Sequence, residues 1–121
     1  MDEPSAAAGA GAPYTFINAM EIEAESVDTF IERWIPRSRH MASADGYLGA
    51  TLYRAVTDDT RFKVVNVSNW TSRAAHEAAT ANPEYRRELD TLFGELPGLK
   101  TNRGHYRAVV HNAPADRRSD G

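Results

Sequence analysis

The stretch from residue 62 to residue 70, FKVVNVSNW, constrains the fold of this chain more than any other stretch does. Its β-branched and aromatic residues, bounded by polar ones, predict a strand. Successive side chains of a strand point to opposite faces, and one face here carries Phe62, Val64, Asn66, Ser68 and Trp70. That face is apolar enough to be buried, yet it holds an amide, a hydroxyl and an indole N–H. Because burying each such group without a partner costs roughly 1–3 kcal/mol, the three groups either satisfy one another or line a cavity that receives a ligand.

The periodicity of the rest of the chain predicts the other elements. Residues 14–22 alternate and predict a first strand, whose apolar face again carries a single amide, Asn18. A helix is expected after Ser26 and should end near 45–46, and Pro36 is expected to kink it or split it in two. The following segments predict, in order, a second strand at 47–56, a turn at 57–60, the strand at 62–70, a helix from Thr71 or Ser72 to about Ala81, a helix from Asn82-Pro83 to Gly94, and a last strand at 103–110.

This order of elements predicts an α+β fold. A hairpin between two helical crossovers is typical of the ferredoxin-like, split βαβ arrangement, with a four-stranded antiparallel sheet and its helices on one face. The other face of the sheet is expected to carry Ile17, Ala19, Val65, Val67 and Val109. Such an apolar patch marks an interface, so we expect a homodimer in which two sheets pack face to face.

Composition limits the classes of partner. The 121 residues carry a net charge of −3, so no basic field favours nucleic acid or an anionic membrane as a partner. The absence of cysteine excludes disulfides, thiolate metal sites and a Cys nucleophile. No apolar run approaches a membrane span and no signal peptide is evident, so a cytoplasmic location is the expectation. We expect one domain at 14–111, between a flexible arm at 1–13 and a disordered tail at 112–121.

Three short patterns stand out within the predicted elements. They are Phe16-Ile17-Asn18 in the first strand, Val64-Val65-Asn66 with Trp70 four residues on, and Asn82-Pro83-Glu84-Tyr85 at the start of the last helix. In these patterns, and in its order of elements, the chain resembles the antibiotic biosynthesis monooxygenases, which are small dimeric α+β-barrel proteins. Within that family it looks most like the cofactor-independent anthrone oxygenases of aromatic polyketide pathways.

The resemblance implies an activity and a set of residues. The implied reaction oxidises an anthrone to a quinone with O₂, so the expected partners are a small aromatic polyketide and O₂, with no cofactor. By the likeness, Asn18, Asn66 and Trp70 are active-site residues. Some members place a Tyr six residues after the Trp, where this chain has His76. An Arg on the last helix also lines some members' pockets, and here the sequence leaves both Arg86 and Arg87 open.

The chemistry needs an electron-rich substrate. Triplet O₂ reacts slowly with closed-shell organic compounds, and the chain shows no GxGxxG motif and no metal-ligand spacing. A deprotonated anthrone is an enolate that can reduce O₂ itself. We expect Asn18 and Asn66 to donate to the enolate oxygen, Trp70 to donate its N–H and stack on the rings, and His76 to move the proton. The expected substrate-binding residues are Phe16, Met20, Phe30, Trp34, Val64, Tyr85, Arg86 and Arg87, and no metal ligand is expected.

Other interpretations stay open. Haem-degrading enzymes of related fold resemble this chain in the strand-one Asn and the strand-three Trp, but their haem-binding His corresponds to Thr80 here, and His76 lies one turn short. A non-catalytic dimeric binding module on the same fold would have a small or closed pocket, with Asn66 and Trp70 bonded to their own protein. Each candidate also has a structural interpretation, such as Trp70 as plain core.

Overall fold

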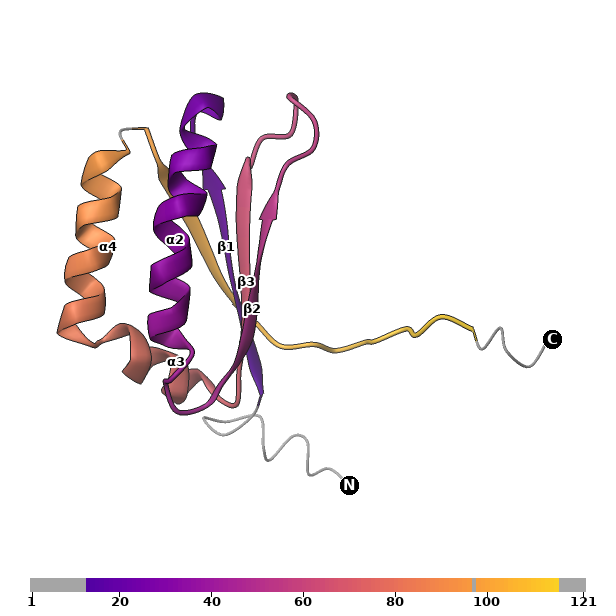
Figure 1. Cartoon of the computed structure of the whole chain (residues 1–121). Coiled ribbons are helices and arrows are strands. Elements are labelled where there is room, and N and C mark those ends of the chain that lie inside the picture. The colour runs from indigo at the N-terminus through magenta and orange to yellow at the C-terminus, as the bar shows by residue number, and fades with distance from the viewer. Residues whose placement is uncertain (1–12, 97, 116–121) are drawn as a thin grey trace, which may run out of the picture.

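A four-stranded antiparallel sheet with all of its helices on one face forms the structure, as predicted (Figure 1). The computed structural model describes residues 13–96 and 98–115. Most of the predicted arm and tail therefore lies outside the described residues. The elements run in the order β1 (Tyr14–Glu21), η1 (Ala24–Ser26), α2 (Val27–Met41), β2 (Tyr47–Arg54), β3 (Val64–Trp70), α3 (Arg73–Thr80), α4 (Pro83–Glu95) and β4 (Lys100–Tyr106).

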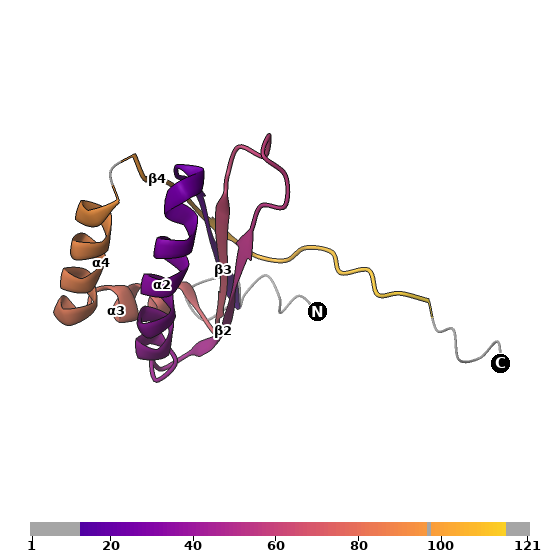
Figure 2. The same cartoon turned by 45° about the horizontal axis from the view of Figure 1, so that its top comes forward.

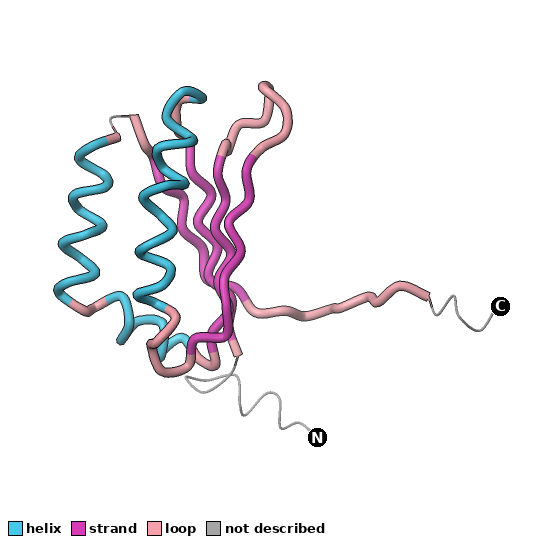
Figure 3. Tube along the Cα trace, viewed as in Figure 1, coloured by secondary structure: helices cyan, strands magenta, loops and turns pink. Residues whose placement is uncertain are grey.

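The strands lie in the order β2-β3-β1-β4, so the two strands that carry the amides are central neighbours. In the antiparallel register, Asn18 is opposite Asn66 on one side and opposite Arg103 on the other. Residues opposite each other share a face of the sheet. Figures 2 and 3 show α2, α3 and α4 on one face of the sheet. Asn18, Asn66 and Arg103 line a cavity together with residues of these helices, so their side chains belong to that face.

Local sequence explains where α3 and α4 begin. The hydroxyl of Ser72, rather than that of Thr71, accepts a hydrogen bond from the Ala75 backbone N–H at 3.1 Å and caps α3. The side chain of Asn82 caps α4 by accepting from the first free N–H groups of the helix, and Pro83 occupies the first helical position, where no donor is needed. The helix ends at Glu95, one residue beyond the predicted Gly94.

Helix α2 differs from the prediction at two places. It is a single helix from Val27 to Met41 with Pro36 inside it, so of the two outcomes expected at Pro36, a kink or a split, the split does not occur. The helix also ends at Met41, before the expected end near 45–46. Pro36 and Glu32 are both exposed, so water can bind the Glu32 carbonyl that the proline leaves without an N–H. The segment after Met41 turns sharply into β2 at Gly46, whose φ is +82°. A Cβ at this position would also lie 2.6 Å from Thr71 and Ala75, so the turn requires glycine.

The ends of the strands also differ from the prediction. The hairpin loop spans 55–63, so β3 begins at Val64 and Phe62 lies outside it. The last strand covers Lys100–Tyr106 instead of 103–110, and its pairing with β1 ends at Thr15 and Tyr106, one residue from the start of β1. Val109 is accordingly 78% exposed in the segment after β4 and is not part of the outer face of the sheet.

The core lies between the sheet and the helices in two clusters. The larger cluster contains Met20, Ile22, Val27, Phe30, Val64, Leu92 and Leu96. The smaller one joins Tyr14, Met41 and Trp70. None of the helices in the described part of the chain has the length and apolar character needed to cross a membrane.

The outer face of the sheet has no helix over it (Figure 1). Ile17 is opposite Val67 and Ala19 is opposite Val65 on this face, as predicted. Tyr53 and Tyr106 widen the patch, and they are 55% and 53% exposed. The predicted homodimer through this face stays a prediction.

Candidate active site

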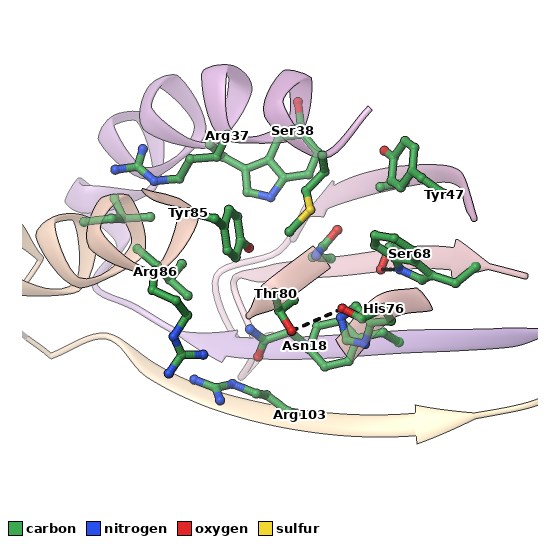
Figure 4. A pocket seen from close by; sticks show the side chains of 18 of the residues that line it. Asn18, Arg37, Ser38, Tyr47, Ser68, His76, Thr80, Tyr85, Arg86 and Arg103 are labelled. Atoms are coloured by element: carbon green, nitrogen blue, oxygen red, sulfur yellow. Dashed lines mark hydrogen bonds between the residues drawn. The ribbon is translucent and has the colours of Figure 1, made fainter. Parts of the chain in front are cut away.

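A cavity of about 250 Å³ lies between the inner face of the sheet and the helices. Its lining includes the four expected catalytic residues, Asn18, Asn66, Trp70 and His76. It also includes six of the expected substrate-binding residues, Phe16, Met20, Phe30, Trp34, Tyr85 and Arg86. One site therefore collects side chains from β1, β3, α2, α3 and α4 (Figure 4).

Two expected lining residues lie elsewhere. Val64 is 1% exposed and packs in the larger core cluster, opposite Met20 in the sheet register. Arg87 is exposed on α4 and does not line the cavity. Consecutive residues of a helix point about 100° apart, so only one of Arg86 and Arg87 can face inward, and it is Arg86.

The two asparagines face each other across β1 and β3. The Oδ1 atom of Asn18 accepts a hydrogen bond from the Asn102 backbone N–H at 3.2 Å, which leaves its NH₂ group as the polar end for a ligand. The Oδ1 atom of Asn66 is buried and has no hydrogen-bond partner among the described residues. An unpaired buried carbonyl is uncommon and costs about 1–3 kcal/mol, so a ligand hydroxyl that donates to Asn66 would recover this energy.

Trp70 uses its polar group within the protein. The residue is 2% exposed, and its Nε1–H donates to the Ser68 hydroxyl at 3.0 Å. The expected donation of this N–H to a ligand is therefore not what the structure shows. The Tyr47 ring packs edge-on against the indole, with 5.2 Å between ring centroids. What Trp70 offers the cavity is a wide, rigid aromatic wall.

His76 belongs to a chain of three polar side chains. Its Nδ1 lies 2.6 Å from the Tyr14 hydroxyl, and the same hydroxyl lies 2.7 Å from Nδ1 of His105. A phenol has one proton, so Tyr14 donates to one histidine and accepts from the other. His76 is 6% exposed, whereas His105 is exposed, so the chain joins the cavity wall to the surface.

The protonation states follow from burial. Burial, with a smaller contribution from the nearby charge of His105, lowers the pKa of His76 from 6.5 to about 4. His76 is therefore uncharged at neutral pH and can accept a proton. Burial also raises the pKa of the Tyr14 hydroxyl above its ordinary value, so that hydroxyl keeps its proton.

Sequence reasoning missed the role of His105. The alternation assumed for a strand at 103–110 placed His105 on the same face as Val109, which was expected to point outward. The register instead places His105 opposite Phe16, on the cavity face. The pattern within β4 does not indicate the face, because the set Thr101, Arg103 and His105 and the alternate set Asn102, Gly104 and Tyr106 are both largely polar; only the register with β1 assigns it.

Charged side chains gather at one end of the cavity. Arg37, Arg86 and Arg103 line it from α2, α4 and β4 (Figure 4). Burial raises the pKa of the Tyr85 hydroxyl, while the positive charges of these three arginines act to lower it. No group of three or more His, Cys, Asp or Glu side chains that could hold a metal ion occurs within the described ranges.

The fold and the site together define a class: a small α+β protein with a cavity of aromatic and amide side chains beneath one face of its sheet. The family model described as "Antibiotic biosynthesis monooxygenase" matches residues 13–91. The chain belongs to this family, and the predicted membership is confirmed. No curated protein matches the chain.

Solved structures agree with this membership. A protein from Shewanella loihica PV-4 with a provisional assignment as a monooxygenase is 28% identical, with a TM-score of 0.71 over 85% of this chain and 100% of the other. SnoaB, a cofactor-independent oxygenase from Streptomyces nogalater, is 22% identical, with a TM-score of 0.70 over 83% and 96%. Rv0793 from Mycobacterium tuberculosis is 15% identical, with a TM-score of 0.68 over 84% and 100%. The last two likenesses show the fold alone.

Proposed function

We propose that this chain is a cofactor-independent monooxygenase that oxidises an anthrone-type aromatic polyketide intermediate to a quinone with O₂. One observation carries the proposal: an uncharged, buried His76 and two facing asparagines share one aromatic-walled cavity. A base beside hydrogen-bond donors is what forming and holding an enolate requires.

The size of the cavity supports a flat aromatic substrate of a few rings. A cavity of about 150 Å³ lined by apolar side chains holds one benzene, and pockets for drug-sized ligands begin at about 300 Å³. The cavity here, about 250 Å³, lies between these values. Its walls are suited to stacking, since Phe16, Trp34 and Trp70 all contribute aromatic faces.

The first step is removal of a methylene proton. Nδ1 of His76 is bonded to Tyr14, so Nε2 is the ring nitrogen left for a ligand. In the productive arrangement, Nδ1–H of His76 donates to the Tyr14 oxygen and the Tyr14 hydroxyl donates to His105. When Nε2 takes the substrate proton, the Nδ1 proton moves to Tyr14 and the Tyr14 proton moves to His105, which releases it at the surface.

The NH₂ groups of Asn18 and Asn66 stabilise the enolate. In this proposal they donate to its oxygen, and removing one such donor typically costs about 2.7–4 kcal/mol of transition-state stabilisation. The enolate then gives one electron to O₂, and recombination of the radical pair forms a C–O bond. The resulting peroxide anion takes up one proton, which replaces the one released in the first step, and becomes a hydroperoxide. The hydroperoxide then loses its second methylene hydrogen together with the outer OH as water, so one oxygen atom of O₂ becomes the new quinone carbonyl and the other leaves in the water molecule.

Turnover of dithranol by metal-free, flavin-free protein tests the proposal. Quinone formation should depend on both protein and O₂, and Asn66→Ala should lower kcat roughly 10²–10³-fold. The matched control is Asn69→Ala, which removes an exposed amide from the other face of β3. Trp70→Phe should mainly raise KM, because Trp70 offers the substrate its ring. Equal kcat in wild type and Asn66→Ala would overturn the assignment of this site.

The Tyr14–His105 route has its own variant. Tyr14→Phe keeps the ring and removes the hydroxyl that joins the two histidines. It should slow hydrogen–deuterium exchange at the methylene of dithranol without O₂ at least tenfold. Unchanged exchange in this variant would leave His76 as the base but exclude the route through Tyr14.

A non-catalytic binding module is the second candidate, and the hydrogen bond from Trp70 to Ser68 favours it. It predicts tight binding of flat aromatics with no O₂-dependent product in the dithranol assay. Haem degradation has less support, because Thr80 donates to backbone carbonyls of its own helix and the cavity is small. Titration with haemin tests it, since a stable Soret shift with an axial His would support haem.

A further inference from the structure

Three arginines gather at one end of the cavity, although the chain as a whole is acidic. Arg37 comes from α2, Arg86 from α4 and Arg103 from β4, so they are far apart in sequence. Figure 4 shows the three side chains at the end of the cavity away from Tyr47. The chain carries a net charge of −3, so an overall excess of basic residues does not explain why three arginines lie together.

The three arginines differ from others in how they are paired. Arg33, Arg54, Arg61 and Arg73 each form an ion pair with a carboxylate. Within 13–96 and 98–115, no carboxylate lies within ion-pair distance of the three at the cavity. Glu77 is the one acidic residue in the described lining, and Arg73 already binds it at 2.9 Å. Positive charge that faces a cavity and has no carboxylate partner among the described residues is suited to an anionic ligand.

Two of the three have their guanidinium groups available. Arg37 donates from Nε and Nη2 to the Glu88 carbonyl at 3.2 and 2.6 Å, which holds its side chain against α4. Arg86 and Arg103 make no side-chain hydrogen bond to any described residue. All three act on the buried Tyr85 hydroxyl, where their positive charges oppose the burial that raises its pKa. Arg37 therefore adds a fixed charge, and Arg86 and Arg103 are the donors left for a ligand.

The register connects this charged end to the reacting centre. Arg103 is opposite Asn18, and neighbours of this kind have Cβ atoms about 4.5–5.5 Å apart. A planar guanidinium binds a carboxylate through two parallel hydrogen bonds, which fixes the orientation of the ligand as well as its place. We propose that the substrate carries a carboxylate, which Arg86 and Arg103 bind while its rings lie between Trp70 and the two asparagines.

This subsite gives the substrate a fixed direction in the cavity. An apolar cavity alone lets a flat ring system enter in several orientations, whereas an anchored carboxylate leaves one methylene within reach of His76. The inference rests on the proposed function in one respect, namely that a flat tricycle occupies the cavity. Its test is therefore a binding measurement that needs no turnover.

Equilibrium binding of anthraquinone-2-carboxylate and of its neutral analogue, 2-(hydroxymethyl)anthraquinone, tests the subsite. Quenching of tryptophan fluorescence reports binding, because Trp34 and Trp70 line the cavity. Wild-type protein should bind the carboxylate at least tenfold more tightly at low salt, and added salt should reduce this preference. Arg103→Gln and Arg86→Gln should each reduce the preference at least fivefold. Arg87→Gln, an exposed neighbour on α4, is the matched control and should leave it unchanged.

The outcomes separate this inference from the proposed function. Equal affinity of wild type for the two compounds, or a preference that survives both arginine variants, overturns the subsite and leaves the oxygenase proposal standing. Binding of neither compound counts against a tricycle in this cavity and therefore overturns both. Both variants alter exposed side chains, so near-wild-type thermal unfolding should confirm that any loss of affinity is local.

Discussion

At the scale of single residues, burial decides what each polar group of the site can do. His76 would be a surface histidine by its position in a short polar helix, but packing against Phe16 and Trp70 removes it from water. The same packing brings its Nδ1 to the Tyr14 hydroxyl. The buried Oδ1 of Asn66 has no described partner and can accept a hydrogen bond from a ligand. The indole N–H of Trp70, in contrast, already donates to the Ser68 hydroxyl.

The lowered pKa of His76 predicts how stability depends on pH. The unfolded chain protonates His76 near pH 6.5, whereas the folded chain does so only near pH 4. Between these values the unfolded state binds more protons, so the free energy of unfolding decreases as the pH falls from 6.5 to 4 and loses nothing further from this residue below that. Since each pKa unit corresponds to about 1.4 kcal/mol, the full loss is about 3 kcal/mol.

Denaturant unfolding at pH 7 and pH 4 measures this effect. His76→Gln keeps a polar partner for Tyr14 but does not titrate, so wild type should lose about 3 kcal/mol more than the variant over this interval. Equal losses in the two proteins would show that His76 titrates at its ordinary pKa.

In the dithranol assay, the acid limb of kcat/KM should fall near pH 4 instead of pH 6.5.

At the scale of elements, local signals predicted where helices begin better than where strands end. Ser72 and Asn82 act on backbone groups two or three residues away, so their roles can be read from short stretches of sequence. The end of β4 is set by its pairing with β1, which is far away in sequence and begins at Tyr14. Because the range and the face of the last strand were both predicted wrongly, neither His105 nor Arg103 was predicted to line the cavity.

The N-cap of α4 offers a prediction at this scale. Asn82 accepts from the backbone N–H groups of Glu84 at 2.8 Å and Tyr85 at 3.2 Å. Replacing it with Ala leaves both groups dependent on water and should lower the free energy of unfolding by about 1 kcal/mol, measured by urea unfolding. Asn82→Asp, which can still accept, should stay close to wild type. An Ala variant as stable as wild type would show that the cap contributes nothing to α4.

At the scale of the whole molecule, the two faces of the sheet have opposite surroundings. Helices cover the inner face and leave room for a cavity, while Ile17, Val65 and Val67 lie on an outer face with no helix over it (Figure 1). Apolar patches of this kind on a sheet are usually covered by another protein surface. We propose that a second copy of this chain covers it, with the two sheets face to face.

Light scattering tests this dimer. Wild-type protein should have twice the chain mass of 13.4 kDa, and Val67→Lys should shift it toward the monomer because it places a charge in the middle of the apolar patch. Thr91→Lys adds the same charge on the exposed side of α4 and should remain dimeric. A wild-type protein of single-chain mass would exclude the dimer and leave the outer face unexplained.

The sequence by itself determined the fold class, the order of the elements and most of the cavity wall. Alternation and capping act over a few residues, so they can be recognised from short stretches of sequence. Alternation predicted that Asn18, Asn66 and Trp70 lie on the buried side of their strands. Only the tertiary structure decided which polar groups are already used. Trp70 binds Ser68, His76 joins His105 through Tyr14, and Arg103 enters the site. The Trp70–Ser68 bond joins two residues of β3 that are two positions apart, whereas the other two outcomes depend on register and packing between segments distant in sequence, which no local pattern encodes.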